Sequence, residues 1–396
     1  MKTIEGGLEK IPGYSFSVME AGIRYENRLD YALIKSDFPC NAAGVFTTCK
    51  VIAAPVKLCK ERINNPINAI LVNSTIANAV TGTQGYENAK VLTQDIAKLI
   101  DIETSSILMS STGVIGRQLP VDKMLSSHKE LVQKLNPNNG QLFSKAIMTT
   151  DTFPKFHVVQ FNAAGKTYYI GGTAKGSGMI APNMATLLAY ILTDAPIKKG
   201  DLEKIFKDKI EKSLNSLTID GDMSTNDTAI ILSPIKQETL SSDSDLSAFS
   251  DALEAVLMKL TEMLAYDGEG ATKLIRIHVR GAKNYDDAKK VGKAIAESPL
   301  VKTAFFGSDP NWGRIACAAG YSGADLEEEK LSISFGNIKV LKNGTPVDFD
   351  NEALKSIISQ REIDLDVDLG LGTAETVILT CDLSYDYVKI NGEYTT

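Results

Sequence analysis

The stretch KGSGMIAPNMATLLAYILTD, residues 175–194, joins a loop that contains glycine and proline to a short apolar run. The run, LLAYIL, is six residues long and is followed by Thr193, Asp194 and then Pro196. Its length and its ending favour a buried β-strand over a helix, although periodicity alone does not separate the two. Thr186 stands directly before the run, at the first position of the predicted strand. Because threonine is common in strands, this stretch by itself predicts a core strand and no particular chemistry.

Strand-like and helix-like segments follow one another irregularly along the rest of the chain. Strands are expected where apolar residues form short or alternating runs, at residues 44–46, 69–72, 107–109, 157–161, 273–281 and 299–306. Helices are expected where apolar residues recur at helical spacing, at residues 202–217, with Asp201 as the N-cap, and at residues 246–264. The polar stretch 236–245 is expected to be a loop. Without a strict βαβ order, the sequence predicts an α/β protein with α+β layering, in which helices flank a sheet.

Composition excludes several classes of protein. The chain has 396 residues, of which 43% are hydrophobic and 23% charged, as in ordinary globular proteins. A formal net charge of −7 argues against a nucleic-acid partner, which normally needs a basic surface. No apolar stretch approaches the roughly 20 residues that a membrane span needs. The five cysteines are scattered without a CxxC pair, which indicates free thiols in a reducing compartment and no zinc site. The start of the chain lacks the features of a signal peptide, so we expect a cytoplasmic location.

The common catalytic and nucleotide-binding motifs do not fit. The three histidines are not adjacent to a serine or cysteine motif, and there is no GxSxG, HExxH or Walker A pattern. GSGMIA, residues 176–181, formally fits the dinucleotide pattern GxGxxA. That pattern should lead into a helix, whereas here Pro182 follows at once and the next apolar run has the length of a strand. If the chain is an enzyme, its base is therefore not expected to be histidine.

A threonine nucleophile can act without histidine. If the chain is cut before Thr186, the new α-amine, with a pKa of roughly 7.7–8.0, can serve as a general base for the hydroxyl of the same residue. Cutting the bond between Ala185 and Thr186 requires an N-to-O acyl shift, and nearby glycines would let the backbone bend into that geometry. Such reactions form oxyanions and need hydrogen-bond donors. Ser111, Thr112 and Gly113 follow a predicted strand and are candidates, although this tripeptide alone predicts a simple turn.

Several stretches together resemble one known family. They are the opening stretch and SSTGVIG, IMTTDTFPK, DGEGATK, SDPNWGRIACAAGYSG and the terminal NGEYTT. In this order they are similar to the glutamate N-acetyltransferase (ornithine acetyltransferase) family of arginine biosynthesis, over nearly the whole chain. One stretch departs from the family pattern: NSTIANAVTGTQG, residues 73–85, stands where relatives carry a sequence richer in glycine and asparagine. The local loop geometry there stays open.

The resemblance implies a fold, an activity and a processing step. The fold would be an αββα sandwich like that of N-terminal-nucleophile enzymes, with a smaller C-terminal α/β portion. The precursor would cut itself between Ala185 and Thr186 into chains 1–185 and 186–396, which would associate as a heterotetramer of two copies each. Thr186 would take the acetyl group from N2-acetylornithine and pass it to L-glutamate. No cofactor or metal would be needed, and some members of the family also use acetyl-CoA as the donor.

The resemblance also implies roles for individual residues. Thr112 and Gly113 would form the oxyanion hole. Lys175 and Thr149 would bind substrate together with Thr186, with Thr150 in place of Thr149 if the register is shifted by one.

Three further positions complete the implied site. Glu269 would meet a substrate amine, and Asn391 and the C-terminal Thr396 would close the site. Asp309 and Arg314 belong to the SDPNWGR stretch, and we assign them only a structural role.

Two alternatives stay open at the level of the sequence. The first is an N-terminal-nucleophile amidohydrolase or aminopeptidase, which would pass the acyl group to water. The second is an uncleaved two-domain protein that binds a small molecule, in which Thr186 is only a strand residue. Acceleration of acetylornithine breakdown by amino-acid acceptors would separate a transferase from a hydrolase. An intact chain of 42.8 kDa in a denaturing gel would favour the binding protein.

Overall fold

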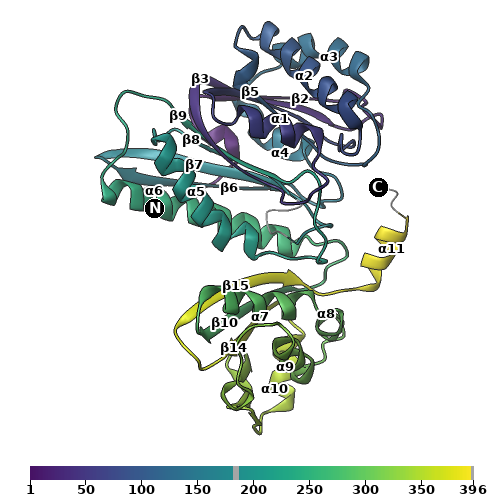
Figure 1. Cartoon of the computed structure of the whole chain (residues 1–396), viewed down its shortest axis with the longest axis vertical. Coiled ribbons are helices and arrows are strands. Elements are labelled where there is room, and N and C mark those ends of the chain that lie inside the picture. The colour runs from purple at the N-terminus through teal and green to yellow at the C-terminus, as the bar shows by residue number, and fades with distance from the viewer. Residues whose placement is uncertain (182–186, 394–396) are drawn as a thin grey trace.

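The computed structural model describes residues 1–181 and 187–393 of the chain (Figure 1). Ala185, Thr186 and Thr396 lie outside the described residues. The apolar run after position 186 is a strand, as the sequence predicts: β8 spans Leu188–Thr193 and is fully buried. It lies inside a nine-stranded sheet, with an antiparallel neighbour on one side and a parallel neighbour on the other.

The large sheet has the strand order β1-β6-β7-β8-β9-β3-β4-β5, with β2 paired to β3. Its strands are β1 (Lys2–Ile4), β2 (Tyr14–Met19), β3 (Tyr31–Phe46), β4 (Ile67–Asn73), β5 (Ile107–Ser111), β6 (Lys155–Ala163), β7 (Lys166–Lys175), β8 and β9 (Thr228–Pro234). β3 is the longest, and its register with β4 shifts between Lys35 and Cys40. Its first half pairs with β2 and β4, and its second half pairs with β9. One irregular strand thus joins two halves of the sheet.

The two halves of the sheet pack face to face. One apolar cluster contains residues of β2, β4 and β5 together with residues of β6, β8 and β9. Phe143 links the halves directly, because its ring lies 6.0 Å from that of Phe16 on β2 and 5.5 Å from that of Tyr190 on β8. Side chains alternate along a strand, so both faces of β8 need apolar residues: Tyr190 faces this inner layer and Ile191 faces the opposite side.

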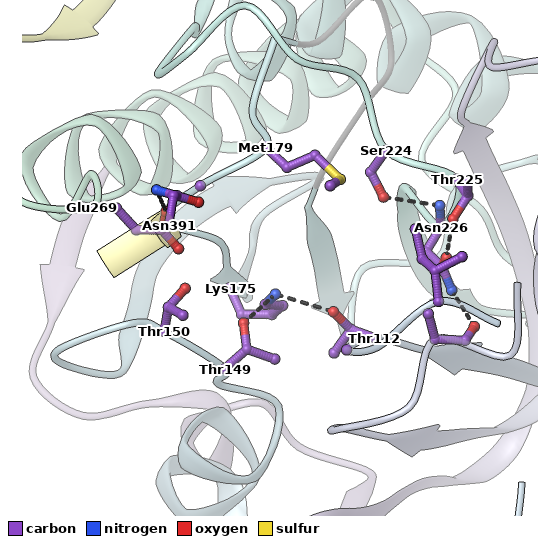
Figure 2. A pocket seen from close by; sticks show the side chains of 14 residues that line it. Thr112, Thr149, Thr150, Lys175, Met179, Ser224, Thr225, Asn226, Glu269 and Asn391 are labelled. Atoms are coloured by element: carbon purple, nitrogen blue, oxygen red, sulfur yellow. Dashed lines mark hydrogen bonds between the residues drawn. The ribbon is translucent and has the colours of Figure 1, made fainter. Parts of the chain in front are cut away.

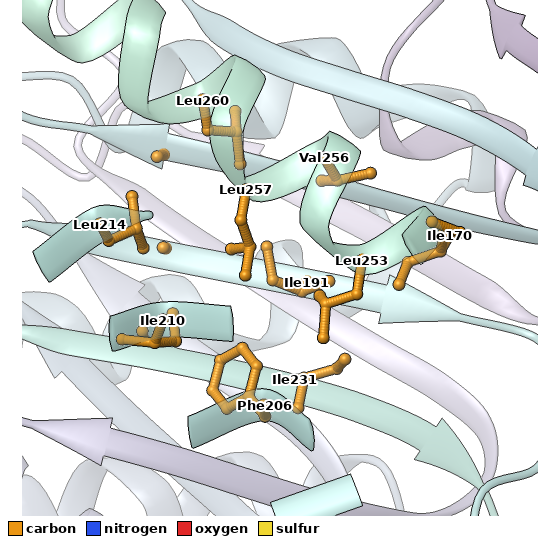
Figure 3. Close-up of a cluster of buried hydrophobic side chains, with 14 of the residues drawn as sticks. Ile170, Ile191, Phe206, Ile210, Leu214, Ile231, Leu253, Val256, Leu257 and Leu260 are labelled. Carbon is orange, nitrogen blue, oxygen red and sulfur yellow. The ribbon is translucent and has the colours of Figure 1, made fainter. Parts of the chain in front are cut away.

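Helices cover the two outer faces, which completes the layers of an αββα sandwich. α1 (Ala54–Arg62), α2 (Gly82–Leu99) and α3 (Val121–Gln133) pack on the half that contains β4 and β5. α5 (Lys199–Lys212) and α6 (Asp243–Tyr266) pack on the half that contains β7, β8 and β9, as Figure 3 shows. The short α4 (Gly140–Ala146) carries Phe143 between the halves. The predicted α/β class with flanking helices is confirmed.

A smaller α/β unit follows in the C-terminal part of the chain, below the sandwich in Figure 1. Its six-stranded sheet has the order β13-β12-β11-β14-β10-β15. Its elements are β10 (Leu274–Ala282), α7 (Tyr285–Glu297), α8 (Pro299–Phe306), α9 (Trp312–Gly320), β11 (Ser332–Phe335), β12 (Ile338–Lys342), β13 (Thr345–Pro346), α10 (Asn351–Ile358), β14 (Glu362–Asp368) and β15 (Ala374–Cys381). Ile275, Ile277 and Val279 of β10 are buried on one face, which confirms the predicted half-buried strand.

Two local predictions were wrong. Residues 299–306 form the helix α8 and not a strand. The side chain of Ser298 caps this helix by accepting from the amide of Val301, and Pro299 occupies its first turn, both of which are signals of a helix start. The predicted helix after Asp201 begins at Lys199, so Asp201 lies in its first turn and is not the N-cap. That helix ends at Lys212, and residues 214–216 form a separate 3₁₀ turn.

The last helix returns from the C-terminal unit to the sandwich. α11 (Tyr385–Glu393) follows β15, and Figure 1 shows it between the two units. The two units also meet at Leu217 and Leu379, which form an isolated β-bridge. In the described parts of the chain, none of the helices has the length and apolar character that crossing a membrane requires.

Candidate active site

A cavity of about 100 Å³ opens where the ends of several strands meet (Figure 2). Its walls come from the segments after β4 and β5, the end of β7, the segment before β9, the loop after α6 and the helix α11. Every predicted site residue that the structure describes lines it: Thr112, Gly113, Thr149, Thr150, Lys175, Glu269 and Asn391. These residues are scattered from position 112 to position 391, so the fold and not the local sequence brings them together.

Lys175 lies at the centre of the cavity wall, at the end of β7. Its Nζ atom donates hydrogen bonds to Oγ1 of Thr149 at 2.8 Å and to Oγ1 of Thr112 at 3.1 Å. Because the Thr112 hydroxyl accepts from Lys175, its own proton is free to point elsewhere. Lys175 pairs with Leu188 in the sheet register, so its backbone lies beside the start of β8.

Gly113 presents its backbone to the cavity in a conformation that only glycine adopts readily. Its φ angle is +129°, and a Cβ atom here would lie 2.1 Å from the carbonyl carbon of Thr75. The flanking amides of Thr112 and Val114 donate to the carbonyl oxygens of Asn73 and Thr75. Among the described residues, the Gly113 amide itself has no hydrogen-bond acceptor. This N–H and the Thr112 hydroxyl are therefore two adjacent donors on the cavity wall.

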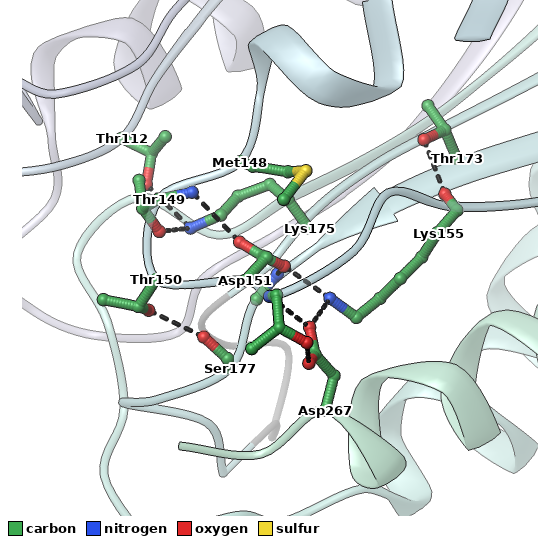
Figure 4. Close-up of polar contacts among 12 residues, drawn as sticks. Thr112, Met148, Thr149, Thr150, Asp151, Lys155, Thr173, Lys175, Ser177 and Asp267 are labelled. Atoms are coloured by element: carbon green, nitrogen blue, oxygen red, sulfur yellow. Dashed lines mark hydrogen bonds and ion pairs between the residues drawn. The ribbon is translucent and has the colours of Figure 1, made fainter. Parts of the chain in front are cut away.

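A buried ion-pair network holds the loop that carries Thr149 and Thr150 (Figure 4). Lys155 donates to Asp151 at 2.6 Å and to Asp267 at 2.5 Å, and all three side chains are almost fully buried. Asp151 also accepts from the amides of Thr149 at 3.0 Å and Gly176 at 2.7 Å. The network therefore connects the loop before β6, which carries Thr149, to Gly176, which directly follows Lys175 at the end of β7.

The opposite wall carries a carboxylate. Glu269 is only 9% exposed, and its Oε2 atom accepts from Nδ2 of Asn391 at 2.8 Å. Gly178 makes room for it, because a Cβ atom at that position would lie 2.2 Å from the same oxygen. The Glu269 amide donates to the carbonyl of Ser177, whose hydroxyl is 2.6 Å from that of Thr150. Thr149 binds Lys175 whereas Thr150 binds Ser177, so both threonines of the predicted alternatives reach the cavity.

Comparison with known proteins identifies the family. The ArgJ family model matches residues 15–396, which is nearly the whole chain. The chain belongs to the ArgJ family. The arginine biosynthesis bifunctional protein ArgJ of Caldanaerobacter subterraneus is 44% identical to it, over 100% of both chains. The ArgJ protein of Geobacter sulfurreducens is 45% identical, over 98% of this chain and 100% of its own.

A solved structure is also similar. The ornithine acetyltransferase of Mycobacterium tuberculosis, crystallised with ornithine, is 32% identical, with a TM-score of 0.43, and the match covers 47% of this chain and 98% of that one. The family inferred from the sequence motifs is confirmed by the family model and the full-length relatives. The chain is accordingly an acetyltransferase of arginine biosynthesis, and neither alternative from the sequence is needed.

Part of the cavity of this ArgJ-family chain was not predicted. Ala77, Ile115, Gly178, Met179, Ser224, Thr225 and Asn226 also line it. Asn226 ties the walls together, since its Nδ2 atom donates to the carbonyls of Ala77 and Ser111 at 2.6 and 2.8 Å. A usable signal was present: the small polar run 224–227 directly precedes the apolar strand β9. β8 and β9 are parallel neighbours, so their starts lie at the same edge of the sheet.

Burial and charge set the ionisation of the buried groups. Burial lowers the pKa of Lys175, and the charge of Asp151 opposes that shift. Burial acts to raise the pKa of Asp151, but the charges of Lys175 and Lys155 outweigh it, so this pKa is lowered. Burial raises the pKa of Asp227, which is 3% exposed and follows the polar run. The two lysines thus favour ionisation of Asp151, whereas burial opposes ionisation of Asp227.

Other predicted residues lie elsewhere. Arg314 donates to the carbonyl of Leu300 at 2.8 Å within the C-terminal unit, and Asn311 caps α9, so these two residues of the SDPNWGR stretch make contacts away from the cavity lining. In residues 1–181 and 187–393, no group of three or more His, Cys, Asp or Glu side chains is arranged to hold a metal ion. The predicted roles of Ala185, Thr186 and Thr396 concern positions outside the described residues.

Proposed function

We propose that the chain transfers the acetyl group of N2-acetylornithine to L-glutamate through an acetyl ester of Thr186, after cutting itself between Ala185 and Thr186. One observation carries the proposal. The Thr112 hydroxyl and the Gly113 amide form a pair of donors in a cavity that also holds the Lys175 cation and the Glu269 carboxylate. Such a pair suits an oxyanion, and the two charges suit an amino-acid substrate.

The first step makes the nucleophile. The hydroxyl oxygen of Thr186 attacks the carbonyl carbon of Ala185, the C–N bond breaks, and the hydroxyl proton passes to the departing amine. Water then hydrolyses the resulting ester, which leaves a carboxylate on Ala185 and restores the Thr186 hydroxyl beside a free α-amine. Leu187, the next residue, accepts through its carbonyl from the amide of Thr228, so the strand that follows the cut is already fixed in the sheet.

The second step moves the acetyl group twice. The α-amine of Thr186 takes the hydroxyl proton, the hydroxyl oxygen attacks the acetyl carbonyl of acetylornithine, and ornithine leaves with a proton on its amine. The amine of glutamate then attacks the acetyl ester and releases Thr186. Thr112 and Gly113 would stabilise the oxyanion in both halves. Lys175 and Thr149 would hold a substrate carboxylate, Glu269 would pair with the side-chain amine of ornithine, and Asn391 and Thr396 would close the site.

The assembled enzyme completes the proposal. Chains 1–185 and 186–396 would remain together as a heterotetramer of two copies each. Because the chemistry needs only a nucleophile, a base and oxyanion donors, no cofactor or metal takes part, and acetyl-CoA would be a second donor as in some family members. All five cysteines are free thiols, which supports a reducing location such as the cytoplasm.

Replacement of the nucleophile tests both steps. Thr186→Ala should leave a full-length chain of about 42.8 kDa that transfers no acetyl group, whereas the parent protein should give two fragments in denaturing mass spectrometry. One fragment should begin with Thr-Leu-Leu-Ala-Tyr in N-terminal sequencing. Cleaved Thr186→Ala protein would remove Thr186 from the mechanism.

The acceptor distinguishes transfer from hydrolysis. Glutamate should accelerate the breakdown of acetylornithine by the purified enzyme and should itself become acetylated. A rate that does not depend on glutamate, with acetate as the product, would indicate a hydrolase and contradict the proposed transfer.

A further inference from the structure

Asp220 makes a set of contacts that the proposed mechanism does not use. Its two carboxylate oxygens accept separately from the amides of Met179 at 2.6 Å and Ile180 at 2.8 Å. The neighbouring amide of Ile219 donates in turn to the carbonyl of Ile180 at 2.6 Å. Asp220 and its neighbour therefore fix the backbone of residues 179 and 180, just before the proposed cleavage bond in the sequence.

The backbone held by Asp220 is in an unusual conformation. Met179 has a φ angle of +56°, in the left-handed region that residues other than glycine rarely adopt. Met179 also lines the cavity, next to Gly178 and close to Glu269. A strained conformation persists only where the surroundings hold it, and two amide hydrogen bonds to one carboxylate supply that hold.

The same carboxylate contacts the C-terminal helix. The hydroxyl of Tyr387, on α11, donates to Oδ2 of Asp220 at 3.3 Å. Asn391 follows one turn later, on the same side of the helix, and donates to Glu269 in the cavity wall. Asp220 thus connects the segment before the cleavage bond with the helix that closes the cavity.

The described residues of α11 are not held by an apolar core. None of its residues is buried, and Tyr385 and Val388 are 83% and 67% exposed. Apart from one edge-to-face contact between the rings of Tyr385 and Phe306 at 5.3 Å, it is held by polar contacts. These are the bonds of Tyr387 and Asn391, and the hydroxyl of Ser384, which donates to the carbonyl of Gly270 at 2.6 Å. A helix held in this way should respond to the loss of a single hydrogen bond.

We infer that Asp220 is a positioning residue with two separable effects. Through the amides of Met179 and Ile180 it sets the backbone geometry needed for self-cleavage. Through Tyr387 it holds α11, and with it Asn391, over the substrate. The inference rests on the proposed function and adds to it a residue that touches neither the substrate nor the reacting atoms.

Three variants separate the two effects. Asp220→Asn replaces one accepting oxygen by a donor that would face an amide, so cleavage of the precursor should slow by about tenfold or more. Tyr387→Phe removes only the hydrogen bond between α11 and Asp220. Cleavage should therefore stay within about twofold of the parent, while KM for the amino-acid substrates should rise several-fold at unchanged kcat. Asp208→Asn makes the same charge change on the exposed surface of α5, where Asp208 pairs with Lys212, and should match the parent in both assays. Cleavage is followed by denaturing mass spectrometry, and transfer by steady-state kinetics.

The outcomes distinguish this inference from the proposed function. Parent protein that neither cuts itself nor transfers acetyl would overturn the proposed function, and the inference with it. If the parent is active, then normal cleavage by Asp220→Asn, or an equal loss in Asp208→Asn, would overturn the inference alone. If Asp220→Asn does not fold by circular dichroism, Tyr387→Phe decides: an unchanged KM would contradict the role of Asp220 in holding α11.

Discussion

At the scale of single residues, the turn at Gly113 shows how the cavity wall is built. The chain must pass so close to Thr75 that no side chain fits, and the positive φ angle turns one amide away from the hydrogen bonds of the sheet edge. The stretch 73–85, which departs from the family pattern, supplies the backbone that Gly113 meets. The loop geometry that the sequence left open is therefore resolved, because residues 75 and 76 of this stretch pack against Gly113, one of the two proposed oxyanion donors.

The residue next to Gly113 can be tested directly. Thr112→Ala removes one proposed oxyanion donor and should lower kcat by about 10²–10³, measured in the acetylornithine–glutamate assay. Thr112→Ser is the matched control, because it keeps the hydroxyl that accepts from Lys175, and it should retain most of the activity. A loss of less than threefold in Thr112→Ala would make Thr112 a turn residue only.

At the scale of elements, one buried histidine joins three of them. The Nε2 atom of His128, on α3, accepts a hydrogen bond from the Tyr31 hydroxyl of β3. Its Nδ1 atom donates a hydrogen bond to Asp95 of α2, and both bonds are 2.7 Å long. This arrangement resembles a catalytic relay, but Tyr31 and His128 are fully buried and lie outside the cavity lining. The sequence-based expectation that the histidines are structural fits this position.

His128 should make stability depend on pH. Burial lowers its pKa below the usual value, while Asp95 opposes the shift. The unfolded chain therefore binds the His128 proton more tightly, and the contribution to stability is present above about pH 6.5 and is lost as the pH falls through the folded-state pKa. His128→Gln, which cannot take up that proton, should show a weaker fall in the free energy of unfolding, by at most about 1.4 kcal/mol per pH unit.

Urea denaturation of the parent and of His128→Gln between pH 7 and pH 5 measures this difference. His157 also has a pKa lowered by burial, but it is common to both proteins and cancels in the comparison. Identical pH slopes would show that His128 does not contribute.

At the scale of the whole molecule, the proposed cleavage products are interleaved in one sheet. β8 and β9, which follow position 186, lie between β7 and β3, which precede it. The apolar cluster between the two halves of the sheet likewise contains residues from both sides of the cut. Neither product could complete the apolar core of the sandwich without the other.

The two products should therefore separate only on unfolding. In native size-exclusion chromatography they should elute as one species, and in denaturing solvent as two chains. Dilution from denaturant of product 1–185 alone should give no folded protein by circular dichroism, and product 186–396 alone should fold only in its C-terminal unit, which has its own apolar core. A sandwich that folds from one product alone would contradict the interleaved core.

The sequence by itself determined the features that depend on local pattern. The length and the ending of the run 187–192 predicted a strand, and the alternation of residues 273–281 predicted a half-buried strand. The motifs identified the family and the types of residue in the site. Local pattern failed at residues 299–306, where an apolar run of strand length forms the helix α8 after a capping serine.

Only the tertiary structure decided which residues meet. The strand order places the ends of β5 and β7 and the start of β9 around one cavity, so Thr112, Lys175 and Asn226 become neighbours. The contacts of Asp220 with the segment before the proposed cut and with α11 likewise join positions 41 and 167 residues apart. The periodicity of apolar residues indicates which side chains are buried. Contacts between residues far apart in the chain depend on long-range packing, which a local stretch of sequence does not show.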